Sequence, residues 1–506
     1  MSQATTLERQ AMNLLFNFFN SASNLVQNAA GINRTLDELI KDRDISKAIT
    51  VFQNRDEKVE QAIKEYDPKS HKIAFKPDKQ RKGKAPKITA KLSMPYQQLI
   101  NEIENTFLYG NSPQWTQTSQ GTDKAFEAFN DFLKTTRWNT TQRQLKRLAG
   151  AETEAAKLYY VYRDEFTNES KVGVKVLAKS KGDEIRPLFD QYDNMLSFGH
   201  GYYLKEGTKT VYHFDIYYPN VIWRCKKGNG GWETIPENNI IGKIPVIYVC
   251  QPEAWKGVQP LIDRIEELRS RVADVNDYVA DPILKMSADI ATAIESNNGP
   301  KSGLPDPETS GGKVVRVPGK DSIMEYLTVD TAVDLKTKEI EDLDKCIKLM
   351  SMTPDMSFEA LVAAGAPTGR ALKRAMALGY MKRAKNIEIY SIAQDREANI
   401  IKAIIGKVLN ISLGIAPNNV TQSEMDRLSV ACEFAEPFQD DVSEKINDII
   451  RLKDAGLIST ETAVSLIDYI QDKDTELDRI AREIQEKDAK EAEERGTMLQ
   501  EFERNN

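Results

Sequence analysis

The sequence predicts an α+β protein in which helices predominate over strands. Between residues 260 and 385, apolar residues recur every three or four positions among charged ones, which is the pattern of long helices with one apolar face. Between residues 158 and 250, apolar and polar residues alternate in short runs separated by turn sequences, which is the pattern of strands. A Gly-, Pro-, Ser- and Asn-rich excursion at residues 296–320 interrupts the helical region.

The composition is ordinary for a folded protein. The chain has 506 residues, of which 40% are hydrophobic and 29% charged, and this length suggests about three domains. The formal net charge of -7 excludes a basic coat for nucleic acid, so any DNA contact has to come from local patches. No run of about 18 apolar residues is present and the first residues do not resemble a secretion signal, so we expect no membrane span and no export. Four widely spaced cysteines without a CxxC pair indicate reduced thiols.

Residues 1–70 carry helical patterns, with apolar stretches at 32–49 and 51–66. Phe16, Phe18 and Phe19 could form a binding face, but such a stripe is more often part of a packed core, and we favour the core.

A concentration of positive charge follows at residues 71–91 and predicts a loop or an arm, since Pro77, Gly83 and Pro86 lie within it. The candidate contact residues of this basic arm are Lys79, Arg81, Lys82 and Lys84. A patch of this density can bind phosphate groups. A solvated loop, or an arm that docks on an acidic neighbour, accounts for the same residues equally well.

Residues 93–250 predict helices followed by strands. The expected helices are 96–108, the stretch around Phe126, Phe129 and Phe132, and 142–156; the expected strands include 172–177, 211–217 and 221–225. His200 and His213 lie in the strand region with no Cys or His at metal-ligand spacing, so we expect no zinc site.

The stretch 240–385 predicts a strand and three long helices. The strand is 244–250, and the helices cover 261–279, 331–350 and the residues from about 368 past 385. Pro282 and Pro354 are expected to end the first two helices, and the excursion between them contains one strand-like run, 313–317. Helices with single apolar seams cannot bury those seams alone, so we expect them to pack on each other and on copies of themselves.

Beyond residue 385 the third helix is expected to continue to Leu409. A strand-like run at 428–434 follows, and then a helix pair within 441–470 that turns at residues 454–457, with Ser459 as a candidate N-cap. The residues after 472 are almost entirely charged, which is typical of a solvated helix with a fraying end.

No sequence motif for catalysis is present. Gly311-Gly-Lys-Val lacks both the spacing and the hydroxyl group of a phosphate-binding loop, and neither GxSxG nor HExxH occurs. Carboxylates such as Glu339, Glu341, Asp342 and Asp344 have helix-surface spacing, whereas a two-metal site needs them in one pocket. We therefore expect no catalysis, cofactor or metal.

Several short motifs occur in a fixed order along the chain. They are Tyr109-Gly-Asn-Ser-Pro113, Tyr218-Pro-Asn220, Ile244-Pro-Val246, Pro260 to Ile265, Asp274 to Tyr278, Lys313 to Pro318, Met352 to Asp355, and Pro367 to Lys373. In this order they resemble the portal proteins of tailed double-stranded DNA phages, over about residues 93–410. Each motif is weak by itself, and the specific signal is their succession.

The resemblance implies a portal fold with a mixed α/β wing, a two-helix stem, a small α/β clip, a helical crown and a C-terminal helix. Carried onto this sequence, the parts are 1–259 (wing, N-terminal part), 260–286 (first stem helix), 287–330 (clip), 331–352 (second stem helix), 353–367 (tunnel loop), 368–440 (wing, C-terminal part) and 441–506 (crown and charged C-terminal helix).

The resemblance also implies a role in the virion. Portal proteins form a ring, dodecameric in the capsid, at one vertex, and DNA is packaged and ejected through its tunnel while the terminase supplies the ATPase. The implied partners are further copies of the chain, double-stranded DNA, the terminase large subunit, a head-completion adaptor, the major capsid protein and scaffold, with no membrane. The implied locations are the virion and, during assembly, the host cytoplasm.

The implied DNA-facing residues lie in two places. The tunnel loop contributes Asp355, Met356, Ser357, Phe358 and Glu359. Because each neutralised phosphate adds a salt-dependent attraction, a moving duplex requires few basic rings. The basic candidates are Lys338, Lys345, Lys348, Arg370, Lys373 and Arg374. Each of them can instead form an ion pair across a subunit interface or with the capsid.

Two other interpretations stay open. One is another ring component of a head-tail connector, which a helix–excursion–helix arrangement over residues 260–352 would separate from a portal protein. The other is a metal-dependent enzyme that processes nucleic acid, which DNA cleavage with a divalent metal would reveal.

Overall fold

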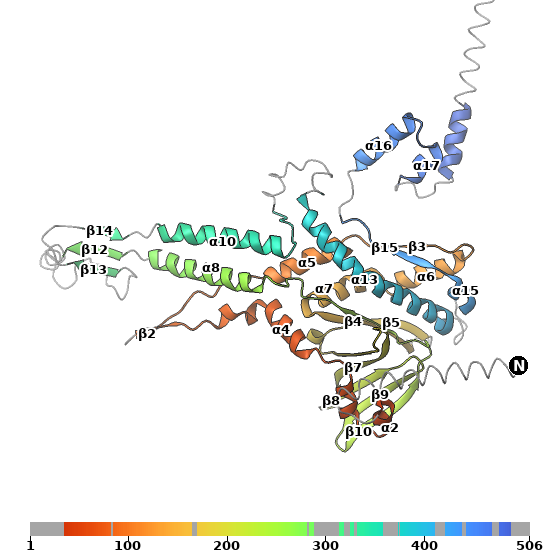
Figure 1. Cartoon of the computed structure of the whole chain (residues 1–506), viewed down its shortest axis with the longest axis horizontal. Helices are drawn as coiled ribbons and strands as arrows, with labels where there is room; N and C mark the ends of the chain where they lie inside the picture. The colour runs from red at the N-terminus through yellow and green to blue at the C-terminus, as the bar shows by residue number, and fades with distance from the viewer. Residues whose placement is uncertain are drawn as a thin grey trace, which may run out of the picture. The chain divides into compact units, whose positions relative to one another are not determined.

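The computed structural model describes most of the chain. The described residues are 35–81, 84–163, 170–280, 283–287, 313–317, 324–327, 331–357, 373, 375–409, 420–437, 442–467 and 475–486. The helix expected before residue 35, most of the excursion and the chain after residue 486 lie outside these ranges. The described part combines helices with several sheets and contains more helix than strand, which confirms the predicted fold class (Figure 1).

The chain divides into two compact units, each described by itself. The first is Met1–Asp355 with Ala377–Pro437, and the second is Met356–Met376 with Phe438–Asn506. The helices of the first unit are α2 (Leu36–Lys41), α3 (Ile45–Val51), α4 (Asp56–Tyr66), α5 (Tyr96–Tyr109), α6 (Asp123–Thr135), α7 (Trp138–Glu152), α8 (Gln259–Ala280), α10 (Thr331–Met350), α13 (Ala377–Ala403) and α15 (Gln422–Arg427). Short turns of 3-10 helix are η1 (Pro68–Ser70), η2 (Lys72–Phe75) and η3 (Lys179–Lys181).

The strands among the described residues all belong to the first unit. They are β1 (Lys79–Arg81), β2 (Lys84–Lys87), β3 (Gln114–Gln117), β4 (Glu154–Arg163), β5 (Ser170–Leu177), β6 (Glu184–Phe189), β7 (Met195–Glu206), β8 (Lys209–Tyr217), β9 (Val221–Gly228), β10 (Gly231–Asn238), β11 (Val246–Cys250), β12 (Ile283–Ser287), β13 (Lys313–Val317), β14 (Met324–Leu327) and β15 (Val430–Glu433).

A five-stranded antiparallel meander runs in the order β10-β9-β8-β7-β6, as the alternating pattern of this region predicts. Leu39 and Ile40 of α2 and Ala48 of α3 pack with Phe214 and Ile216 of β8 in one buried cluster. The single helix expected over residues 32–49 is wrong, because Arg43 adopts a left-handed backbone conformation (φ 61°) and separates α2 from α3.

The main core lies between a second sheet and α13. This sheet has the order β11-β4-β5, and Tyr159 of β4 and Ile247 of β11 share a buried cluster with Tyr390 and Ile401 of α13. The strand expected near residues 428–434 is present as β15, and it pairs with β3, a strand that the sequence did not predict.

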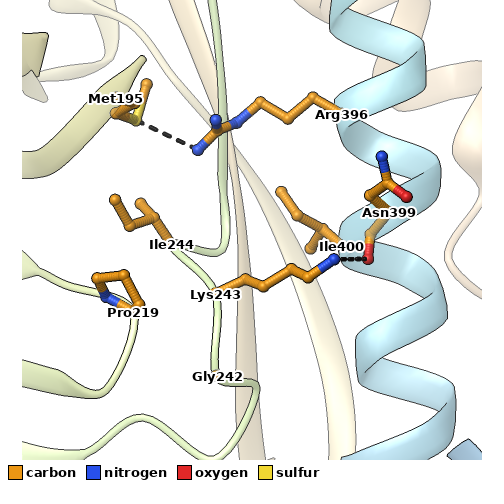
Figure 2. Close-up of a pocket in the computed structure, with 8 residues that line it drawn as sticks. All are labelled: Met195, Pro219, Gly242, Lys243, Ile244, Arg396, Asn399 and Ile400. Atoms are coloured by element: carbon orange, nitrogen blue, oxygen red, sulfur yellow. Dashed lines mark hydrogen bonds between the residues drawn. The ribbon is translucent and has the colours of Figure 1, made fainter. Parts of the chain in front are cut away.

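Helix α13 changes character at its C-terminal end. The helix expected to run to Leu409 ends at Ala403 and continues as one π-helical turn, η5 (Ile404–Val408). Gly406 in this turn allows α15 to approach closely, since a Cβ atom there would lie 3.0 Å from the Cα atom of Gln422. A cavity of about 400 Å³ lies beside residues 396–400 of α13 (Figure 2).

The excursion between α8 and α10 contains a small sheet with the order β13-β12-β14, in which β12 pairs parallel with β13 and antiparallel with β14. The resemblance extends the first stem helix to residue 286, but α8 ends at Ala280, close to the stop predicted at Pro282, and residues 283–287 form β12. The physical reason is Pro282, which lacks a backbone donor and cannot continue a helix.

The second unit contains α16 (Val442–Asp454), α17 (Thr460–Ser465) and a helical stretch at residues 475–486. The expected helix pair and its turn are present, and the side chain of Ser459 accepts a hydrogen bond from the backbone N–H of Thr462, which confirms the predicted N-cap.

Candidate functional site

Helices α8 and α10 form a pair that leads to and from the small sheet (Figure 1). Ile262 and Ile265 of α8 share a buried cluster with Ile347 of α10, as the apolar seams predict. Each fully buried isoleucine contributes roughly 1.5–3 kcal/mol relative to an exposed one. At the surface of the pair, Arg264 of α8 donates to Glu339 of α10 at 2.8 Å.

An extended segment, residues 90–94, covers another face of α8, and we call it the strap. Three alternate backbone N–H groups of the strap donate hydrogen bonds to side chains of α8. The N–H of Ala90 donates to Asp274 (2.9 Å) and that of Leu92 donates to Oγ of Ser270 (3.0 Å). The N–H of Met94 donates to Glu266 (2.8 Å). Two residues of extended chain advance about 6.6 Å, and four residues of helix advance about 6 Å. Alternate strap residues therefore match every fourth residue of α8, which explains how buried polar side chains on this helix are satisfied.

The basic arm expected at residues 71–91 is anchored at both ends and is not a free loop. His71 and Ile73 are buried at its start, and β1 and β2 form an antiparallel ribbon in its middle. At its base, Asp78 accepts hydrogen bonds from the backbone and side chain of Thr89. Lys79, Arg81 and Lys84 belong to the strands of this ribbon, and Lys82 lies outside the described residues.

His71 joins the start of this segment to α8. Its Nδ1 lies 2.6 Å from Oε1 of Glu266 and its Nε2 lies 2.7 Å from the carbonyl oxygen of Glu65. Both ring nitrogens therefore face acceptors, a geometry that fits a doubly protonated ring. Burial by itself would lower the pKa of His71, but the bond to Glu266 outweighs it and the pKa is raised.

This geometry predicts a pH dependence. Because the folded-state pKa of His71 is raised, its stabilising contribution is present below the ordinary value of 6.5 and is lost as pH rises through the raised pKa. The thermal unfolding midpoint of the protein is therefore expected to fall as pH rises above 6.5. The fall is expected to be smaller in His71→Gln than in the control variant His213→Gln on β8. An equal fall of the thermal midpoint with pH in the two variants would contradict a protonated His71.

The end of α10 is closed by a tight backbone motif. The N–H of Met352 donates to the carbonyl of Leu349 (3.1 Å), and the N–H of Thr353 donates to that of Lys348 (2.8 Å). Met352 has a left-handed backbone (φ 52°), as a helix-ending Schellman motif requires. Pro354 follows directly, in agreement with the predicted stop at this position.

The basic candidates on α10 differ in their surroundings. Lys348 lies 2.7 Å from Asp344 and 2.8 Å from Asp355, and although burial opposes it, these carboxylates raise its pKa. Lys338 and Lys345 are exposed and seven residues apart on the same side of the helix. The structure thus separates one lysine held within its own chain from two that point to solvent.

The other predicted site residues fall between positions 355 and 374 of the chain. Asp355, Met356 and Ser357 are described and exposed, and Lys373 is half-buried. Phe358, Glu359, Arg370 and Arg374 lie outside the described residues.

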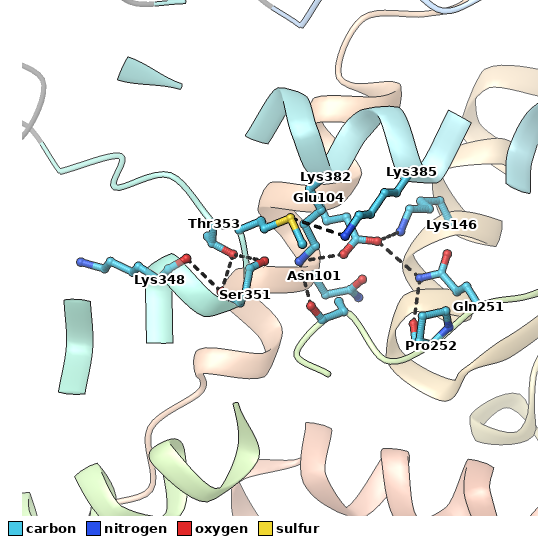
Figure 3. A network of polar contacts seen from close by, with 12 residues as sticks. Asn101, Glu104, Lys146, Gln251, Pro252, Lys348, Ser351, Thr353, Lys382 and Lys385 are labelled. Atoms are coloured by element: carbon cyan, nitrogen blue, oxygen red, sulfur yellow. Dashed lines mark hydrogen bonds and ion pairs between the residues drawn. The ribbon is translucent and has the colours of Figure 1, made fainter. Parts of the chain in front are cut away.

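A buried ion cluster, which sequence reasoning missed, lies next to the end of α10 (Figure 3). Glu104 of α5 pairs with Lys146 of α7 and with Lys382 of α13, the latter at 2.9 Å. Lys382 also donates to the carbonyl of Ala254 (2.7 Å). Burial raises the pKa of Glu104, but the two ammonium groups outweigh it and bring the pKa to about 2. The cluster joins three helices at one point.

A second buried ion cluster joins α13 to the β11-β4-β5 sheet. Glu397 accepts from Lys157 (2.7 Å) and from the hydroxyl of Tyr159 (2.6 Å), and also from the amide of Gln142. Lys157 and Glu397 are both fully buried. Neither ion cluster could be found from the sequence, because charged residues at these positions have the spacing of a solvated helix face or an ordinary strand.

The described residues hold no group of three or more His, Cys, Asp or Glu side chains placed to bind a metal ion. Among the helices of the same residues, none is both long and apolar enough to cross a membrane.

Comparisons with known proteins give a family. The family model described as "Phage portal protein, SPP1 Gp6-like" matches residues 42–490. No curated protein sequence matches the chain. A chain of the solved structure "Neck of native GTA particle computed with C12 symmetry" is 9% identical with a TM-score of 0.35, covering 74% of this chain and 88% of that one.

A chain of "Virion of native gene transfer agent (GTA) particle" is 8% identical, also with a TM-score of 0.35, covering 82% of this chain and 94% of that one. A structural likeness at this level carries no conclusion about function. The family match spans most of the sequence, and the chain therefore belongs to the family of phage portal proteins described as SPP1 Gp6-like.

Proposed function

We propose that this protein forms a closed ring of identical chains, a dodecamer in the capsid, at one vertex of a phage head, and that DNA is packaged and ejected through its central channel. The observation that carries the proposal is membership of the portal family over residues 42–490. A head-to-tail ring needs two different surfaces that meet between neighbours, and a paired-helix element repeated around an axis supplies such surfaces.

The α8–α10 pair supports the assignment of a stem. Helix α8 has 22 residues and α10 has 20, so each is about 30 Å long. In this proposal the stem is 259–280 with 331–350, the clip is the small sheet and the residues around it, and the tunnel loop follows the end of α10. The remaining sheets with α13 form the wing, and residues 441–506 form the crown and C-terminal helix.

Lys338 and Lys345 are the stem residues best placed to contact passing DNA, because both are exposed. Lys348 already has two carboxylate partners, so its net attraction for phosphate is weaker. Few unpaired cations per chain suit a channel through which DNA moves, since each phosphate contact adds a salt-dependent attraction. The tunnel-loop residues and Arg370, Lys373 and Arg374 belong to the same proposal.

The proposed partners follow from this role. The clip would dock the terminase during packaging and a head-completion adaptor afterwards, and the ring would contact the major capsid protein and scaffold. The chain itself would act without catalysis or a cofactor, in the virion and, during assembly, in the host cytoplasm.

Native mass spectrometry of the purified protein tests the proposal. We expect a homo-oligomer of about a dozen copies of the 57.1 kDa chain, because closed rings have a defined subunit number. The same sample is expected to leave duplex DNA intact in the presence of magnesium. A stable dimer that cuts DNA under these conditions would contradict the proposal and favour the enzyme interpretation.

A further inference from the structure

The cavity beside α13 is lined by two kinds of side chain (Figure 2). Met195, Pro219, Ile244 and Ile400 give it an apolar wall, and Lys243 and Arg396 bring two cations to it. The lining comes from the start of β7, the turn between β8 and β9, the loop between β10 and β11, and α13, so the cavity is built by segments that are distant in sequence.

Arg396 has no ion-pair partner among the described residues. Its Nε donates to the carbonyl of Val246 (3.0 Å), and its Nη2 contacts Sδ of Met195 (3.5 Å), which is a weak, neutral acceptor. Burial lowers the pKa of Arg396, and no carboxylate opposes this. A partly buried guanidinium without a carboxylate is costly to keep, and it becomes favourable when an anion reaches it.

Lys243 likewise has no ion-pair partner in the part of the chain that the structure describes. Its Nζ donates to the carbonyl of Asn399 (3.1 Å). Burial lowers the pKa of Lys243, and the nearby charges of Lys402 and Lys407 lower it further, while Asp426 acts in the opposite direction. This part of the molecule therefore gathers positive charge that its own carboxylates do not balance.

The backbone is shaped to place one of these lysines over the loop. Lys407 lies in the π-helical turn η5, a feature that frequently occurs at functional sites. Its Nζ lies next to Gly242, where the backbone has φ of +70°, a conformation that favours glycine.

We propose that this cavity binds an acidic segment of a partner protein, with its carboxylates on Lys243, Arg396 and Lys407 and an adjacent apolar side chain against the wall. Because several cations lie at the cavity, a ligand with more than one carboxylate matches their charge best. The apolar wall can contact an apolar peptide side chain, whereas it makes no favourable contact with a hydrated inorganic ion. A DNA duplex presents its phosphates on a broad convex surface, which cannot enter a recess between a loop and a helix. This proposal does not rest on the channel proposed above.

Isothermal titration calorimetry on the full-length protein tests the proposal with three probes: acetyl-Phe-Glu-Glu-amide, its neutral counterpart acetyl-Phe-Gln-Gln-amide, and inorganic phosphate. We expect about one acidic peptide per chain, with a dissociation constant at least tenfold lower than that of the neutral peptide. The double variant Lys243→Ala/Lys407→Ala is expected to weaken binding of the acidic peptide at least tenfold.

The matched control is Lys47→Ala/Lys134→Ala, which removes the same charge from two exposed positions on α3 and α6. It is expected to change the dissociation constant less than twofold. Without peptide, the Lys243→Ala/Lys407→Ala protein is expected to melt no earlier than the wild type, since like-charge repulsion is removed, and this readout shows that the variant is folded.

Equal binding of the acidic and neutral peptides would overturn the proposal, and so would equal weakening by the control variant. Binding of inorganic phosphate without binding of the acidic peptide would show an oxyanion site and refute docking of a protein segment.

Discussion

Replacing Glu397 with glutamine is expected to lower the free energy of unfolding of the first unit by about 3–5 kcal/mol. The substitution keeps the size of the side chain but leaves the ammonium group of Lys157 without a counter-charge, and both residues are fully buried. Burial already lowers the pKa of Lys157 and Glu397 opposes that shift, so without the carboxylate the lysine is driven towards its neutral form.

Urea unfolding followed by tryptophan fluorescence measures this effect, because the Lys157 ammonium lies 5.6 Å from the centre of the Trp138 ring. The control is Glu388→Gln, an exposed position on the same helix, for which we expect a change below about 0.5 kcal/mol. Similar losses in both variants would mean that the buried pair is not what holds α13 against the sheet.

Acid is expected to destabilise the protein partly through Glu104. Burial raises the pKa of this carboxyl, but Lys146 and Lys382 bring it to about 2, below its ordinary value of 4.5. A depressed folded-state pKa gives stability that is complete above the ordinary value and is lost as pH falls towards 2. The shift corresponds to about 3 kcal/mol in all, of which about 2 kcal/mol is lost between roughly pH 6 and pH 3.

Urea unfolding of the wild type and of Glu104→Gln at these two pH values isolates the contribution. The wild type is expected to lose about 2 kcal/mol more than the variant, whereas Glu102→Gln, an exposed partner of Arg147, is expected to follow the wild type. A Glu104→Gln protein with the same acid sensitivity as the wild type would contradict the depressed pKa.

The long helices and the meander could be predicted because their patterns are local. The seam that includes Ile262 and Ile265 has helical spacing, and both residues are buried against α10. Strand alternation likewise identified the region of β4 to β11. Proline also marked the end of α8 correctly, since the helix ends at Ala280, just before Pro282.

The parts that the sequence did not predict depend on distant partners. Strand β3 exists as a strand because β15 pairs with it from more than 300 residues away. Glu104, Lys157 and Glu397 look like surface residues until tertiary packing brings their counter-charges together. The same holds for the cavity, where Met195, Lys243 and Arg396 come from three separate elements.

The candidate site, too, could be predicted only in part from the sequence. The succession of motifs around α8 and α10 is in the sequence, and the family match agrees with it. Which lysine of α10 is free was not predictable, because Lys338, Lys345 and Lys348 are equivalent in pattern. The structure shows that Lys348 is paired with Asp344 on the same helix and with Asp355 just after the helix end.

Single-particle electron microscopy of the assembled protein tests the central claim most directly. We expect a closed ring of about a dozen chains, with the α8–α10 pairs arranged around an axial opening wide enough for a DNA duplex, and with Lys338 and Lys345 near that opening. An open filament, or a ring in which the α8–α10 pairs lie on the outer rim away from the axis, would contradict the account.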